Sequence, residues 1–147
     1  MPSPPPNQGG GWSFVPYITP SGKCEVLDDL DRLRGKEMKK YAQFEKVIKP
    51  AMEKYGPFEV GGGYWESVTG GLYEVRFGRG RIYCSLRSQL IMMYRYVTKF
   101  WPKMRPTDRT FCERCRAEAD SVDYEGDYEK RSLLYRGICQ RRHNGIA

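Results

Sequence analysis

Histidine is nearly absent from the sequence: of 147 residues only His143, close to the C-terminal end, is one. Acid–base chemistry in the body of the chain must therefore use other side chains. Apolar runs are also short, and none approaches the roughly 20 residues of a membrane-spanning helix. Residues 1–6 lack the basic start and apolar stretch of a signal peptide. We therefore expect a cytoplasmic chain with no membrane partner.

The cysteines are few and odd in number, five in all, which favours reduced thiols over a disulfide framework. Cys112 and Cys115, followed by Cys139 and His143, have the residue types and local spacing of a Cys3His zinc site. However, Cys112 and Cys115 fall inside a predicted helix, and Cys115 belongs to its apolar stripe. We therefore expect no metal ligands here, with zinc kept as the alternative.

Acidic residues are almost missing from one stretch of the chain. The whole sequence has a formal net charge of +7 and a pI of about 9.2. Residues 75–111 hold nine basic side chains and a single acidic one, Asp108. Such a balance favours a polyanionic partner such as nucleic acid, an anionic membrane or an acidic protein. The nine are Arg76, Arg79, Arg81, Arg87, Arg95, Lys99, Lys103, Arg105 and Arg109.

Turn residues and apolar spacing divide the first half of the chain. Residues 1–11 are rich in Pro and Gly and predict a disordered leader. Residues 12–18 predict a strand that Pro16 confines to a sheet edge or a strand end. Residues 25–55 have helical spacing and predict two helices, with Pro50 kinking or restarting the second.

The second half changes to a period of two. Residues 64–68 predict a short strand or strand entry, and three longer strands follow as an antiparallel meander. A helix then begins at Pro106, and the polar tail has at most a short helix around residues 128–135. The three strands are residues 72–77, 81–87 and 90–97.

Alternation along the first two strands of this meander gives the basic residues one common face. If the apolar face packs on the helices, Arg76, Arg81 and Arg87 point the other way, beside Tyr83. Guanidinium groups bind phosphates, and one aromatic ring can stack on a base. The alternative is a solvated sheet face whose charges serve solubility.

This order of elements resembles the RelE/ParE toxin superfamily, most of all its HigB and phage-derived RelE-like branch. Residues 71–76 (GLYEVR) are similar to the branch's Gly-Leu-aromatic-Glu-Leu-Arg signature, and residues 81–83 (RIY) to the signature of the next strand. Residues 91–107 are similar to the following apolar strand and its lysine-bearing turn, although the usual Lys-Lys pair is reduced to Lys99. The resemblance spans residues 12–124.

The resemblance implies an α+β fold with an N-terminal strand, a two-helix hairpin, a three-stranded antiparallel meander and a C-terminal helix, the RelE-like microbial RNase fold. Residues 12–124 would be the toxin domain, and residues 125–147 a polar C-terminal extension. It also implies a ribosome-dependent mRNA endonuclease of a type II toxin–antitoxin system, which needs no metal or small-molecule cofactor. Its partners would be mRNA on the ribosome and a cognate antitoxin.

The resemblance assigns roles to ten residues. The family's late catalytic Tyr, His or Asp has its nearest counterpart at Asp123 and Tyr124. Two alternatives stay open: a ParE-like, non-catalytic gyrase inhibitor, and a catalytically inactive nucleic-acid-binding module of phage origin. The predicted catalytic residues are Arg76, Arg81, Lys99 and Tyr124, and the predicted RNA-binding residues are Arg79, Tyr83, Arg87, Arg95, Lys103 and Arg105.

Overall fold

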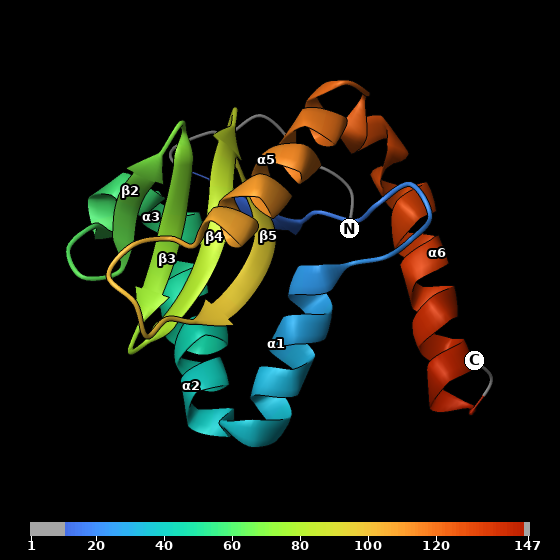
Figure 1. Cartoon of the computed structure of the whole chain (residues 1–147), viewed down its shortest axis with the longest axis horizontal. Helices are drawn as coiled ribbons and strands as arrows, with labels where there is room; N and C mark the ends of the chain where they lie inside the picture. Colours follow the sequence, from blue (N-terminus) through green and yellow to red (C-terminus); the bar gives the residue numbers. More distant parts are fainter. Residues whose placement is uncertain (1–10, 146–147) are drawn as a thin grey trace.

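The chain folds around one mixed β-sheet with helices on both faces. The computed structural model describes residues 11–145, so residues 1–10 of the predicted leader lie outside it. Figure 1 shows α5 crossing one face of the sheet, while the segment from α1 to α4 lies on the other side. The α+β class is confirmed. The strands are β1 (Ser13–Pro16), β2 (Trp65–Thr69), β3 (Leu72–Phe77), β4 (Gly80–Arg87) and β5 (Leu90–Thr98). The helices are α1 (Glu25–Lys36), α2 (Met38–Ala42), the π-helical η1 (Gln43–Ile48), α3 (Lys49–Tyr55), α4 (Pro57–Val60), α5 (Pro106–Asp120) and α6 (Tyr124–His143).

The sheet has five strands in the spatial order β1-β5-β4-β3-β2. Strands β2 to β5 form an antiparallel meander, one strand more than the three predicted, because β2 pairs with β3, with one register shift between Ser67 and Thr69. The predicted three-stranded meander is therefore not confirmed. Strand β1 pairs in parallel with β5 at the sheet edge. That edge position is the one predicted from Pro16, which has no amide hydrogen to donate.

Aromatic rings join the helical layer to the sheet. Phe44 of η1 contacts Phe14 edge-on, with ring centroids 5.5 Å apart, and stacks on Phe77 at 5.6 Å. All three side chains are buried. These contacts pack the apolar face of β3 against the helices. The charged residues of β3, Glu74 and Arg76, therefore lie on its opposite face.

The helix that runs from Met38 to Tyr55 widens to π geometry directly before Pro50. In an α-helix the proline ring collides with the carbonyl four residues earlier, and the missing amide leaves that carbonyl without a donor. A π-helical segment changes the local hydrogen-bond spacing at this point. Ile48 and Lys49 keep helical dihedral angles, so the helix continues into α3.

Helix α5 covers the sheet face that was predicted to be open. Its buried residues Cys112 and Ala119 face the sheet, and below them Tyr83 and Ser85 of β4 are buried as well. The Ser85 and Tyr94 hydroxyls lie 2.6 Å apart in a hydrogen bond. Alternation therefore placed these side chains on the correct face, but α5 leaves only the β2–β3 side of that face accessible.

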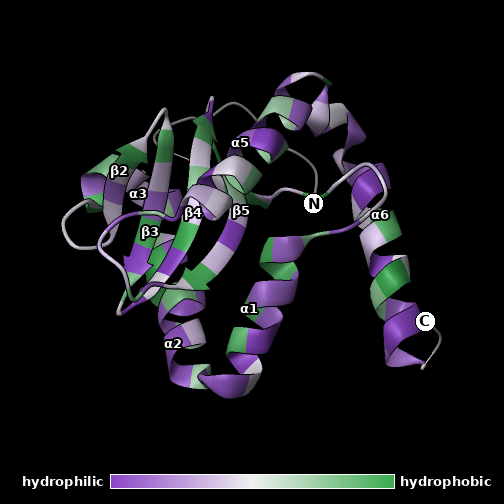
Figure 2. Cartoon of the chain, viewed as in Figure 1, coloured by the Kyte–Doolittle hydropathy of each residue, from purple (hydrophilic) through white to green (hydrophobic). Residues whose placement is uncertain are grey.

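The C-terminal helix is longer than the predicted residues 128–135, although Figure 2 shows it coloured largely as polar. Arg131, 2% exposed, donates from Nη1 and Nη2 to the two carboxylate oxygens of Glu118, at 2.6 and 3.0 Å. Its Nε donates to Asp127 at 2.8 Å, and Nη1 also donates to the Ile18 carbonyl at 2.9 Å. The domain boundary expected after residue 124 thus falls in the first turn of a helix that packs on the rest of the chain.

We expect Glu118→Gln to lower the free energy of unfolding at neutral pH by about 1–3 kcal/mol, because buried Arg131 loses one of its two charged acceptors. Hydrogen bonds from Arg131 hold the pKa of Glu118 below its ordinary value. The stabilisation is therefore complete above about pH 5 and is lost as the pH falls through the lowered pKa. Urea denaturation should show the two proteins converging at acidic pH. A stability difference that persists unchanged there, or one that Glu129→Gln reproduces, contradicts this assignment.

Candidate nucleic-acid interface

A cationic pocket opens on the part of the sheet that α5 leaves uncovered. Its volume is about 560 Å³, and its walls come from β2, β3, the segment between β5 and α5, and the first turn of α5. Four basic side chains and one acidic side chain line it: Arg76, Lys99, Lys103, Arg109 and Glu74. Three of the basic residues, Arg76, Lys99 and Lys103, are ones that the sequence analysis selected. The structure therefore brings part of the predicted site together.

Glu74 lies at the centre of this group. Its Oε2 atom is 3.5 Å from Nε of Arg76 and 3.5 Å from Nε of Arg81, and its Oε1 atom is 3.9 Å from Nζ of Lys99. The Glu74 side chain is only 7% exposed, and among residues 11–145 its Oε1 atom has no hydrogen-bond partner. One carboxylate thus lies among three cations, and its Oε1 atom is buried without a hydrogen bond.

Strand register explains this cluster. Arg76 of β3 lies directly opposite Arg81 of β4, and Glu74 lies opposite Tyr83. Residues two apart on a strand share a face, so the four side chains project to the same side of the sheet. Alternation puts Glu74 on the same face as Arg76, but its role was missed because the basic stretch was counted from residue 75. Its alternation with Arg76 was the signal that identifies it.

Arg81 does not face the pocket as the predicted phosphate clamp. Its Nη1 donates to the carbonyls of Gly78 and Gly80, at 2.8 and 2.9 Å, and its side chain is 11% exposed. The β3–β4 turn therefore holds this guanidinium. Arg81 acts on the pocket through Glu74, while Arg76, 37% exposed, remains available to a ligand.

The predicted roles of Tyr83 and Tyr124 are wrong, since neither side chain has exposed surface. Tyr83 lies under α5 and cannot stack on a base. Tyr124 donates its hydroxyl to the Pro16 carbonyl and accepts from the Ile18 amide, both at 2.7 Å, so it anchors α6. Burial raises the pKa of both hydroxyl groups, which further excludes either as a base at neutral pH.

Two predicted RNA contacts point elsewhere. Arg87 donates to the Ala119 carbonyl at 3.0 Å and pairs with Asp120 and Glu125 near the end of α5. Arg95 lies 3.6 Å from Asp29 of α1. Carboxylates and a carbonyl thus hold both residues away from the pocket.

The last two predicted contacts lie near the segment that enters α5. The guanidinium of Arg79 lies over the ring of Phe100 at 5.3 Å, and that of Arg105 over Trp101 at 4.1 Å. These arginine–aromatic pairs flank the part of the chain from which Lys99 and Lys103 enter the pocket.

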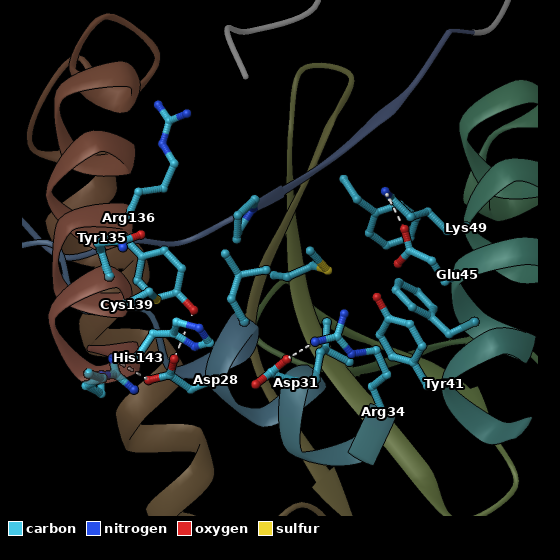
Figure 3. A pocket seen from close by; sticks show the side chains of 18 of the residues that line it. Asp28, Asp31, Arg34, Tyr41, Glu45, Lys49, Tyr135, Arg136, Cys139 and His143 are labelled. Carbon is cyan, nitrogen blue, oxygen red and sulfur yellow. Dashed lines mark hydrogen bonds and ion pairs between the residues drawn. The ribbon is translucent and has the colours of Figure 1, made fainter. Parts of the chain in front are cut away.

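A larger hollow of about 1060 Å³ separates α1 and η1 from α6 (Figure 3). Its charged side chains are mostly paired: Lys49 lies 3.3 Å from Glu45, and Asp28 accepts from the Tyr135 hydroxyl at 2.9 Å and pairs with Arg142 at 3.6 Å. This pairing leaves less charge for a polyanion than the smaller pocket offers.

The cysteines do not assemble a metal centre in the part of the chain that the structure describes, where no group of three His, Cys, Asp or Glu side chains could hold an ion. Cys112 and Cys115 are buried in α5, while Cys139 and His143 line the hollow beside α6. Burial raises the pKa of Cys115 to about 11, so this thiol stays protonated. The described residues also contain no helix with the length and apolarity to cross a membrane.

The buried hydroxyl of Tyr83 provides a stability test. It has no hydrogen-bond partner among the described residues, so Tyr83→Phe should leave the free energy of unfolding unchanged or raise it by up to about 1 kcal/mol. Tyr94→Phe is the matched control, because it removes the bond to Ser85 and should cost about 1 kcal/mol. Urea denaturation distinguishes them, and an equal loss in both variants contradicts the burial of an unpaired hydroxyl.

Comparisons with known proteins leave the family unassigned. No family model matches the chain, and a search of curated protein sequences finds no match. The function proposed below therefore rests on the pocket and on the sequence motifs that line it.

Proposed function

We propose that this chain binds RNA in the cationic pocket and cleaves it without a metal, as the mRNA endonuclease of a type II toxin–antitoxin pair. The observation that carries the proposal is a carboxylate, that of Glu74, set among Arg76, Arg81 and Lys99 where it lines the cationic pocket. The RelE-like motif at residues 71–76 contributes Glu74 and Arg76 to this pocket, which supports the same function.

Charge explains why the ligand would be a phosphodiester. Arg76, Lys99 and Lys103 converge on one cavity, and cations placed this way bind phosphate oxygens. The first turn of α5 begins at Pro106, next to the lining residue Met104, and adds the partial positive charge of a helix N-terminus. An acidic protein could also bind these cations. The carboxylate of Glu74, however, adds a group that can accept a proton in a reaction.

Cleavage by a ribose 2′-hydroxyl needs a proton acceptor, and Glu74 supplies it in place of the buried Tyr124. The Glu74 carboxylate takes the hydroxyl proton, and the 2′-oxygen then bonds to phosphorus. The bond to the 5′-oxygen breaks, and that oxygen takes a proton from Lys99. Arg76 stabilises the negative charge on the phosphorane-like transition state. The products are a 2′,3′-cyclic phosphate and a 5′-hydroxyl end, so DNA, which has no 2′-hydroxyl, is not cleaved.

A catalytically inactive RNA-binding module is the second candidate. The observation that favours it is the position of Arg81, whose Nη1 is taken by two turn carbonyls, leaving fewer cations free to stabilise a transition state. This candidate keeps the same pocket and the same ligand. The two candidates therefore differ in cleavage and agree in binding.

Arg76→Ala tests binding. We expect RNA affinity to fall about tenfold or more, because a charge-assisted contact to phosphate is lost, and the slope of log affinity against log salt to fall by about 1. Fluorescence anisotropy with labelled single-stranded RNA measures both. Arg114→Ala, an exposed change elsewhere on α5, is the control. Equal affinities for the two variants would remove the pocket from RNA binding.

Glu74→Gln tests catalysis, because it keeps the side chain's shape and removes its basicity. We expect cleavage to fall by about 10²–10⁴-fold, the usual contribution of a general base, while RNA binding is retained or tightened. Mapping mRNA ends after induced expression in translating cells measures cleavage on the ribosome. Glu59→Gln, exposed on α4, is the control. If wild type binds RNA but produces no new ends, the inactive module is the correct function.

A further inference from the structure

Phe100 is the most exposed of the large apolar side chains in the part of the chain that the structure describes, at 69%. It follows Lys99, which lines the cationic pocket, on the segment between β5 and α5. Exposing a phenylalanine ring to water is unfavourable relative to burying it. A single exposed ring needs no explanation by itself, so its surroundings decide whether it has a function.

The ring of Phe100 is held in place at the pocket's end of the sheet. The Lys99 amide donates to the Arg79 carbonyl at 2.8 Å, which fixes this segment against the β3–β4 turn. The Arg79 guanidinium then lies over the Phe100 ring at 5.3 Å. Trp101 and Arg105 repeat this pairing one residue further along, at 4.1 Å. The apolar ring is therefore set among cations that attract phosphates.

Other exposed aromatic rings have simpler explanations. Phe58, 58% exposed, meets Trp65 and Tyr73 edge-on, at 6.0 and 5.7 Å, and closes an aromatic cluster beside α4. Phe100 instead follows the pocket residue Lys99 directly, and the Arg79 guanidinium lies over its ring. Tyr83, predicted from the sequence to stack on a base, is buried and leaves this role without a residue.

We propose that Phe100 is the base-stacking residue of the site, and that the substrate is therefore single-stranded RNA. This inference rests on the proposed function. With a phosphate bound by Lys99 and Arg76, the base of an adjacent nucleotide stacks on one face of the Phe100 ring, and the Arg79 guanidinium lies over the other. Aromatic stacking tolerates any base, so the contact selects unpaired bases and not a sequence. In a duplex the base faces are already stacked and the contact is unavailable.

The test measures anisotropy of a labelled single-stranded RNA of about ten nucleotides, within the site sizes of single-strand binders. Phe100→Ala should weaken binding about 5- to 100-fold, the range for loss of one stacked base, and Phe100→Trp should restore it. The same RNA with abasic nucleotides should bind wild type as weakly as intact RNA binds Phe100→Ala. Tyr55→Ala, an exposed aromatic on α3, is the control.

The outcomes separate this inference from the proposed function. If Arg76→Ala weakens RNA binding while Phe100→Ala does not, the pocket binds RNA but the stacking role is overturned, and Phe100 serves a protein partner. If Phe100→Ala weakens duplex and single-stranded RNA equally, single-strand selection is overturned. If wild type binds no RNA at all, the proposed function and this inference both fail.

Discussion

Three cations lie within 4 Å of one buried carboxylate at the floor of the pocket, and this cluster is the interaction on which the proposed site depends. Without Glu74, Arg76 and Arg81 would face one another across neighbouring strands, where like charges repel. A buried charge is tolerated only when other charges or hydrogen bonds compensate it. Here the compensation is mutual, and it leaves an excess of positive charge for a ligand. Structure and proposed chemistry therefore depend on the same carboxylate.

The strands that build this cluster were predictable because alternation is local. Strand β3 has the predicted bounds, residues 72–77, and β4 and β5 differ from prediction by one residue at one end. The faces were also correct, since Glu74, Arg76 and Arg81 share the side opposite Val75. What alternation cannot predict is which part of a face stays open. That depends on where α5 packs, a contact between segments far apart in the sequence, and α5 buries Tyr83.

The C-terminal helix shows a second limit of sequence reasoning. Its residues are largely polar, and polarity ordinarily indicates exposure. Arg131 is buried nonetheless, because Glu118, Asp127 and a carbonyl oxygen accept its hydrogen bonds. Compensation of a buried charge depends on hydrogen-bond partners in distant parts of the chain. The sequence around Arg131 does not indicate those partners. Tyr124, taken as a catalytic candidate from its position near the end of the resembling region, is explained by the same anchoring.

The anchoring of α6 is uneven along its length. Near its start, Tyr124 and Arg131 bind the segment after β1, whereas further along Tyr135 and Arg142 both reach the single carboxylate of Asp28. The first part of α6 is thus held by Tyr124 and Arg131. The rest of the helix contacts α1 through the carboxylate of Asp28. Amide hydrogens should exchange with solvent fastest toward residue 143, where the helix lies beside the hollow in Figure 3.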